Sequence, residues 1–212
     1  MIIVLSGRSG AGKTSACRLV EAALAPSGMP LGGVLCGAVF ETGVKVGILV
    51  SDVSRGLGHP AANLARAVPQ DVRRVPLPDQ GIPGMIRYGM WYFDEAALRA
   101  ADEAASLFLA ASGSAAPRSV AFVDEIGPME LDHTIGMIRT LAGLDAAAGS
   151  AMATQSPDCI VVARPDIAGR LAIRWPLSLC IDMETLSVRE AADAMLDALG
   201  RGSGTPSGST LS

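Results

Sequence analysis

The sequence begins MIIVLSGRSGAGKTS, from Met1 to Ser15. The apolar run at its start predicts a short buried strand over Met1–Ser6. A glycine-rich segment follows, and the spacing of apolar residues after it predicts a helix over Lys13–Ala25. A strand, a glycine-rich loop and a helix in this order indicate an α/β fold that binds an anion where the helix begins.

The loop fits the pattern G-x-x-x-x-G-K-[ST] over Gly7–Thr14. Glycines allow the backbone N–H groups to converge on a phosphate, and the positive end of the helix dipole points to the same place. Lys13 is one of only two lysines in the chain, and its compact ammonium suits the β- and γ-phosphates. The predicted nucleotide-binding residues are Gly7, Arg8, Ser9, Gly10, Ala11, Gly12, Lys13, Thr14 and Ser15.

A second candidate feature is the apolar strand Ser119–Val123, which ends in Asp124 and Glu125. In phosphate-loop enzymes such an aspartate holds Mg²⁺ together with the loop hydroxyl, here that of Thr14. A glutamate directly after it can take a proton from attacking water, so Lys13 and Glu125 are the predicted catalytic residues. Adjacent strand residues point in opposite directions, so both acids share one site only if the strand ends at Asp124.

Strand and helix patterns alternate along the chain, with a predicted hairpin near the start, which favours a mostly parallel sheet covered by helices on both faces. Residues 54–84 are rich in Gly, Pro and Arg and are predicted to form a loop, with a short strand near Val72–Val75. We expect one domain over residues 1–199, a hairpin insert at about 33–52 and a disordered tail over 200–212. The other predicted strands are Val34–Phe40, Val44–Val50, Cys159–Ala163 and Leu177–Ile181, and the other helices are Phe93–Ala111, Thr134–Ala147, Pro165–Ile173 and Val188–Leu199.

The composition excludes several classes of protein. A net charge of −4 and a pI of about 5.2 argue against a general nucleic-acid binder and against binding to an anionic membrane surface. No apolar run approaches the roughly 18 residues of a spanning helix, so we expect a cytoplasmic protein. The four cysteines form no C-x-x-C pair and are predicted to be small core residues. The sequence does not indicate a protein partner.

The stretch VDEIGPMEL, Val123–Leu131, resembles the second nucleotide motif of the small P-loop nucleoside-triphosphatases, the family of the cancer-related nucleoside-triphosphatase. The hairpin region Gly32–Asp52 and the segment that starts at Arg87 resemble the same family in kind and order. The resemblance covers about residues 1–135. It implies a P-loop three-layer sandwich and magnesium-dependent hydrolysis of nucleoside triphosphates, with broad base tolerance. An Asn-Arg-Asp-like segment expected before the last helix is replaced by the residues from Met183 to Glu190.

Several interpretations stay open at the level of sequence. A nucleotide or small-molecule kinase would carry the same phosphate loop, with the segment Pro69–Arg87 as a candidate lid. A nucleotide-dependent switch or accessory protein is a third class, although the chain lacks an N-K-x-D guanine signature. For ten further residues the sequence is compatible with either a contact to substrate or a purely structural role. They are Arg8, Arg55, Arg87, Trp91, Tyr92, Phe93, Glu130, Arg164, Arg170 and Arg174.

Overall fold

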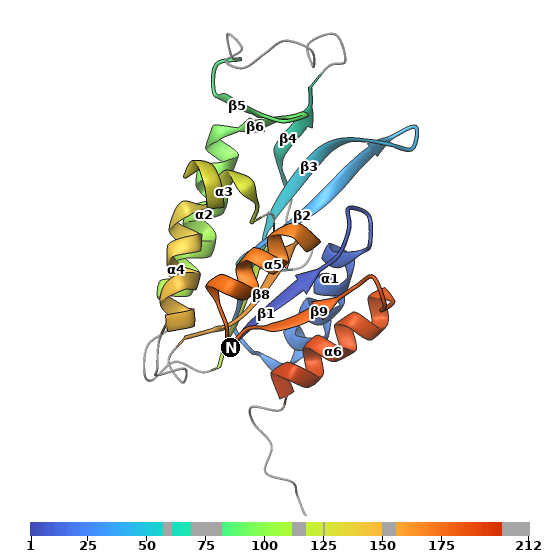
Figure 1. Ribbon diagram of the computed structural model, residues 1–212, viewed down its shortest axis with the longest axis vertical. Helices are drawn as coiled ribbons and strands as arrows, with labels where there is room; N and C mark the ends of the chain where they lie inside the picture. Colours follow the sequence, from blue (N-terminus) through green and yellow to red (C-terminus); the bar gives the residue numbers. More distant parts are fainter. Residues whose placement is uncertain (57–60, 69–81, 112–117, 125, 150–155, 201–212) are drawn as a thin grey trace, which may run out of the picture.

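One mixed β-sheet forms the centre of the protein (Figure 1). The computed structural model describes residues 1–56, 61–68, 82–111, 118–124, 126–149 and 156–200. Within these residues nine strands are present, in the spatial order β5-β6-β4-β3-β2-β7-β8-β1-β9. The strands are β1 (Ile2–Ser6), β2 (Leu31–Glu41), β3 (Val44–Asp52), β4 (Ala62–Ala67), β5 (Met85–Tyr88), β6 (Trp91–Asp94), β7 (Val120–Val123), β8 (Asp158–Ala163) and β9 (Leu179–Asp182).

The sheet has a parallel half and an antiparallel half that share β2. Strands β2, β7, β8, β1 and β9 pair in parallel, whereas β2, β3, β4, β6 and β5 pair in antiparallel fashion. Every residue of β1 and β7 is buried, as expected for parallel strands covered on both faces. In Figure 1 the antiparallel half rises beyond the carboxyl ends of the parallel strands.

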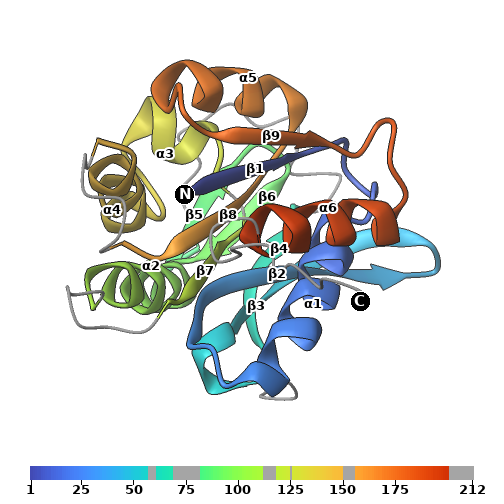
Figure 2. The ribbon, with the colours of Figure 1, turned by 90° about the horizontal axis from the view of Figure 1, so that it is seen from below.

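Helices cover both faces of the parallel half. Two of them pack against each other on one face and three lie on the opposite face, as Figure 2 shows. Among the described residues no helix has the length and apolar character needed to cross a bilayer. The first face carries α1 (Lys13–Leu24) and α6 (Val188–Gly200), and the second carries α2 (Glu95–Ala110), α4 (Ile138–Gly149) and α5 (Pro165–Arg174).

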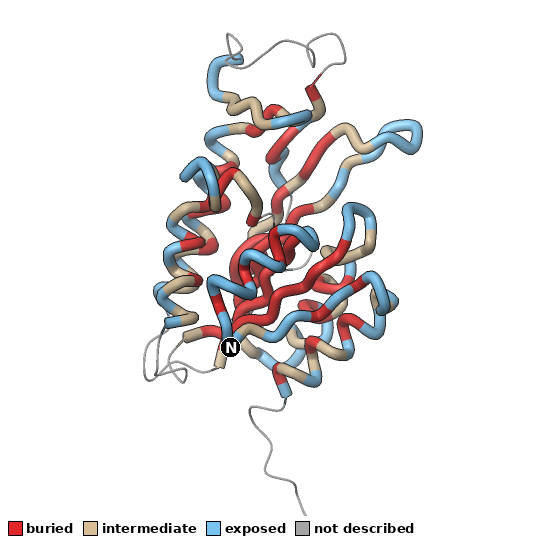
Figure 3. Tube along the Cα trace, viewed as in Figure 1, coloured by how far each residue is buried: buried red, intermediate tan, exposed pale blue. Residues whose placement is uncertain are grey.

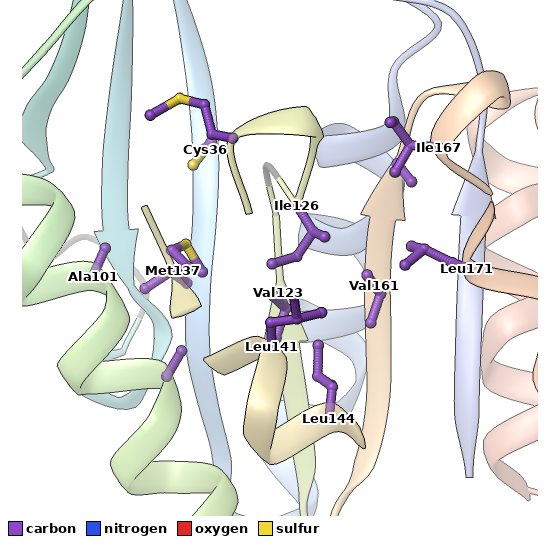
Figure 4. Close-up of a cluster of buried hydrophobic side chains, with 14 of the residues drawn as sticks. Cys36, Ala101, Val123, Ile126, Met137, Leu141, Leu144, Val161, Ile167 and Leu171 are labelled. Atoms are coloured by element: carbon purple, nitrogen blue, oxygen red, sulfur yellow. The ribbon is translucent and has the colours of Figure 1, made fainter. Parts of the chain in front are cut away.

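Alternating residues of the central strands divide between two hydrophobic cores. Ile3 and Leu5 of β1 pack with α1 and α6, whereas Ile2 and Val4 pack with the other three helices. This alternation follows from the two-residue period of a strand. Buried segments concentrate in the central strands in Figure 3, and Figure 4 shows side chains such as Val123 and Val161 meeting those of α4 and α5.

The predicted fold class is confirmed, and so is the early hairpin, which consists of β2 and β3 joined at Thr42 and Gly43. The antiparallel part is larger than the sequence predicted. Ala62–Ala67 lies in the segment expected to be a loop, yet it forms β4 because β3 and β6 supply hydrogen-bonding partners on its two sides. The strand predicted near Val72–Val75 and the tail over 201–212 lie outside the described residues.

Two helix boundaries were wrong. The helix predicted from Phe93 begins at Glu95, because the aromatic residues Trp91–Phe93 belong to β6 and the Asp94 carboxylate caps α2 by accepting from the Ala97 N–H. The helix predicted over Thr134–Ala147 is preceded by a separate helix, α3 (Pro128–His133). Thr134 has a left-handed φ of 54°, which ends α3, and α4 starts only at Ile138.

We expect Gly33→Ala to lower the free energy of unfolding by about 2 kcal/mol or more. Gly33 lies in β2 with a φ of +87°, and an added Cβ would come within 2.0 Å of the Phe122 carbonyl oxygen on the neighbouring strand β7. A backbone oxygen within a paired strand cannot move aside as a side chain can. Urea denaturation followed by circular dichroism measures the effect.

Gly37→Ala is the matched control, because Gly37 lies in the same strand with open space around its Cβ position and no positive φ. It should leave the stability unchanged or raise it slightly, since alanine loses less backbone entropy on folding. Equal stabilities for the two variants would contradict the role given to Gly33.

Candidate nucleotide-binding site

The carboxyl ends of the central parallel strands meet at one edge of the sheet, where open α/β sheets bind ligands. β1 ends at Ser6 and continues into the loop from Gly7 to Gly12, which leads directly into α1. β7 ends at Val123, and Asp124 follows at once. The predicted phosphate loop and Asp124 therefore emerge at the same edge, separated by the single strand β8.

The loop has the backbone geometry for which its glycines are needed. Gly10 and Gly12 have φ angles of +84° and +87°, a region that other residues rarely adopt. At Gly12 an added Cβ would also lie 2.5 Å from Cγ2 of Val188, at the start of α6. Gly12 thus allows both the turn into α1 and the close approach of the two helices.

The Lys13 side chain folds back over the loop that precedes it. Its ammonium donates to the carbonyl oxygens of Gly7, at 2.6 Å, and of Arg8, at 2.8 Å. These two bonds hold the charge within the turn of the loop, at the amino terminus of α1. The positive charge of Lys13 and the positive end of the α1 dipole therefore act on the same small region.

Asp124 connects the acidic strand end to the phosphate loop. The residue is only 3% exposed, and its Oδ2 accepts from the Thr14 hydroxyl at 2.8 Å and from the Cys36 N–H at 3.1 Å. The Thr14 contact joins residues 110 positions apart in the chain. The structure thus brings together the hydroxyl and the carboxylate that the sequence predicted to share a metal ion.

The residues present fit Mg²⁺. This ion prefers hard oxygen ligands and is held by one or two protein oxygens together with phosphate oxygens and water. Thr14 and Asp124 supply a hydroxyl and a carboxylate beside the phosphate loop. No cluster of three or more His, Cys, Asp or Glu side chains able to hold a metal exists within the described residues, so an all-protein cage is not available there.

Glu125, the predicted base, lies outside the described residues. Glu130, whose role the sequence left open, is a buried structural residue. Its Oε2 accepts from the Gly127 N–H at 2.9 Å and caps α3, while Oε1 accepts from the Met137 N–H at 3.1 Å. Glu130 therefore holds the start of α3 and the connection from α3 to α4 in place.

Two arginines of α5 bind carboxylates of the protein itself. Arg170 forms two hydrogen bonds with Asp132 and lowers the pKa of that carboxyl group. Arg174 pairs in the same way with Asp145 and lowers its pKa. Each pair ties α5 to a helix of the α3–α4 region, so Arg170 and Arg174 have structural roles.

Two exposed arginines make further contacts with neighbouring carboxylates. The side chain of Arg8 is 82% exposed and lies 3.2 Å from a Glu184 carboxylate oxygen, in the turn between β9 and α6. Arg55 lies 3.3 Å from Asp52 at the end of β3. The Arg8 contact places the β9–α6 turn, which departs from the resembled family, directly beside the phosphate loop.

The aromatic residues of β6 pack within the fold. Tyr92 and Phe93 are buried, and Trp91 is half-buried with the Lys45 ammonium 5.1 Å from its ring centre. The structure therefore shows these three side chains in a packing role, one of the two roles that the sequence left open.

Cys17 is a core residue beneath the site. Burial raises the pKa of its thiol well above the usual value, and the negative charge of Asp124 raises it further. The side chain is therefore a neutral thiol at physiological pH. Cys36 and Cys159 are also buried, as predicted, whereas Cys180 is exposed on β9.

A protein-family model described as NTPase matches residues 2–140. This chain belongs to the NTPase family. The match begins at β1 and contains the phosphate loop, the antiparallel half and the acidic strand, and it ends within α4.

Similar proteins agree with this family. The chain is 31% identical over 129 residues to the nucleoside-triphosphatase THEP1 of Methanopyrus kandleri, a match that covers 61% of this chain and 59% of that relative. The solution structure of a human cancer-related nucleoside triphosphatase superposes with a TM-score of 0.66 at 17% identity, covering 95% of this chain and 98% of that one. The crystal structure of THEP1 from Aquifex aeolicus gives 0.61 at 14% identity, with 95% and 100% covered. The two solved structures establish the shared fold.

We expect Glu130→Gln to lower the free energy of unfolding by about 1–3 kcal/mol, because the amide nitrogen cannot accept a hydrogen bond from Gly127 or Met137. Affinity for magnesium nucleotide should stay close to wild type. Glu103→Gln, on the exposed face of α2, is the control and should leave stability unchanged. A variant that keeps full stability and loses turnover would instead assign chemistry to Glu130.

Proposed function

We propose that the protein hydrolyses nucleoside triphosphates to diphosphate and phosphate with Mg²⁺. The observation that carries the proposal is the hydrogen bond from Thr14 to Asp124, which joins a loop of phosphate-binding geometry to a buried carboxylate. Membership of the NTPase family and the printed name of the Methanopyrus kandleri relative support it. Neither support specifies the nucleotide base or the metal.

The phosphates would be bound by the loop and the first turn of α1. Backbone N–H groups at a helix start bind anions, because four of them lack partners within the helix and the dipole favours negative charge. The Lys13 ammonium can exchange the carbonyl oxygens of Gly7 and Arg8 for β- and γ-phosphate oxygens. We assign this binding to the backbone and side chains of Gly7, Arg8, Ser9, Gly10, Ala11, Gly12, Lys13, Thr14 and Ser15.

Thr14 and Asp124 would hold Mg²⁺, Thr14 through its hydroxyl and Asp124 directly or through water. Bound there, the ion supplies neutralisation of the β- and γ-phosphate charge. The Cys36 N–H donates to the same Asp124 oxygen as the Thr14 hydroxyl and so helps to hold the carboxylate beside Thr14.

Glu125 would act as the base. Water attacks the γ-phosphorus, the bond to the bridging β-oxygen breaks, and the water proton passes to the Glu125 carboxylate. Lys13 stabilises the negative charge that accumulates on the leaving diphosphate. The two catalytic residues therefore act at opposite ends of the reacting phosphoryl group.

Lys13→Ala should reduce kcat/KM for magnesium ATP by at least about 10²-fold, because it removes the ammonium that the loop carbonyl oxygens hold at the start of α1. Phosphate release from purified protein measures this. Lys45→Ala removes the other lysine, which lies over Trp91 in the antiparallel half, and should retain wild-type turnover. Equal turnover in the two variants would remove the assignment of Lys13.

Glu125→Gln should keep the affinity for magnesium ATP and lose about 10²- to 10⁴-fold in hydrolysis, because the amide cannot take the proton of the attacking water. Calorimetry measures binding and phosphate release measures turnover, with Glu41→Gln, exposed at the end of β2, as the surface control. Hydrolysis at the wild-type rate in Glu125→Gln would show that another group activates the water.

A kinase is the second candidate function. A kinase needs an acceptor pocket, and a hollow of about 480 Å³ lies between the β5–β6 region and α2, lined by polar residues that include Asp94, Arg99 and Glu103. ATP turnover that stays negligible until a nucleoside, a nucleoside monophosphate or another acceptor is added would favour phosphotransfer.

A nucleotide-dependent switch would behave differently from both enzymes. Slow hydrolysis with tight product retention, accelerated by a partner, would favour that function.

A further inference from the structure

β8 lies between the two strands that carry the proposed site. On one side β8 pairs with β1, with Ala163 opposite Ser6, and on the other side it pairs with β7, with Val161 opposite Val123. The residue after Ala163 is Arg164, so by register it is the neighbour of Gly7, the first residue of the phosphate loop. The pairing ends at Ser6 and Ala163, and parallel strands are about 4.8 Å apart, so Gly7 and Arg164 leave the sheet from adjacent positions.

The alternation of β8 assigns Arg164 to the face of the sheet that carries α1. Arg164 has extended φ and ψ angles of −79° and 159°, so the alternation of β8 continues through it. Ile160 and Val162 pack in the core with α1 and α6, and Ala163 packs in the core on the other face. Arg164 is next in the alternation, so it belongs to the face of Ile160, Val162 and α1. Pro165 then starts α5 and rigidifies this exit from the strand.

Arg164 also differs from its neighbouring arginines in its contacts. Arg170 and Arg174 are paired with Asp132 and Asp145, and Arg8 lies against Glu184. The side chain of Arg164 is exposed and forms no hydrogen bond or ion pair with another residue in the described part of the chain. Among the described residues no side chain therefore competes with a ligand for the Arg164 guanidinium.

We propose that Arg164 contacts the γ-phosphate of the bound nucleotide and stabilises the charge of the transition state from within the same chain. This inference rests on the proposed function, and it settles which of the three arginines after β8 takes part. A planar guanidinium can donate two parallel hydrogen bonds to the oxygens of one phosphoryl group, in contrast to the point charge of Lys13. The proton transfer to Glu125 and the bond broken at phosphorus are unchanged.

The test compares Arg164→Ala with Arg170→Ala as the matched control, because both remove an arginine from the same strand–helix unit. Arg164→Ala should lower kcat for magnesium ATP by about 10²- to 10³-fold, the usual effect of losing one donor to transition-state charge. KM and the melting temperature should change little. Arg170→Ala should keep kcat near wild type and lower the melting temperature through loss of the Asp132 pair.

A binding measurement separates a transition-state contact from a structural effect. Magnesium ADP with aluminium fluoride mimics the transferring phosphoryl group, whereas magnesium ADP alone does not. Arg164→Ala should lose affinity for the aluminium fluoride complex by a factor similar to its loss in kcat and keep its affinity for ADP. Arg164→Lys should recover part of this affinity, because the charge returns without the two-pronged geometry.

Turnover of Arg164→Ala within about threefold of wild type would overturn the inference while leaving the proposed hydrolysis intact, since a transition-state donor is worth far more than that. Equal loss of affinity for ADP and for its aluminium fluoride complex would also overturn it. If wild-type protein releases no phosphate, the proposed hydrolysis fails. The aluminium fluoride arm still decides the role of Arg164, because it measures binding alone.

Discussion

The candidate site depends on one hydrogen bond, from the Thr14 hydroxyl to the buried carboxylate of Asp124. Thr14 lies in the first turn of α1, after the loop that follows β1, whereas Asp124 directly follows β7. Strand β8 separates β1 from β7. A loop that binds phosphate and a residue that supports a metal ion act on one substrate only when they are held in a common frame. The parallel pairing of β1, β8 and β7 supplies that frame, and the Cys36 N–H from β2 holds the carboxylate from the opposite side.

The cationic side chains of α5 and Lys13 of the phosphate loop contact different kinds of group. Arg170 and Arg174 bind carboxylates of the helices that cover the sheet, where they tie α5 to its neighbours. Lys13 is held by carbonyl oxygens of the loop, neutral groups that a phosphate can replace as a partner. A cation already bound to a carboxylate has less to gain from a phosphate, which is consistent with a structural role for Arg170 and Arg174.

The antiparallel half extends the sheet at the carboxyl ends of the parallel strands and contributes no residue to the phosphate loop. β2 takes part in both halves, so the hairpin and the strands beyond it are rigidly connected to the strand that contacts Asp124. Gly33 makes this connection possible, because a side chain there would collide with the backbone of β7. The hollow beside α2 is a consequence of this extension and lies apart from the phosphate loop.

The sequence by itself determined the phosphate loop, the buried strands and the family, because these depend on local patterns such as glycine spacing and apolar runs. It predicted Thr14 and Asp124 as partners only through their residue types. Only the tertiary structure decided the contact between them, the existence of β4 and the capping role of Glu130. It also showed that Arg170 and Arg174 pair with carboxylates, whereas Arg164 forms no such pair within the described residues. These features depend on pairing between distant segments, and a strand such as Ala62–Ala67 has too weak a pattern to show its partners until the sheet supplies them.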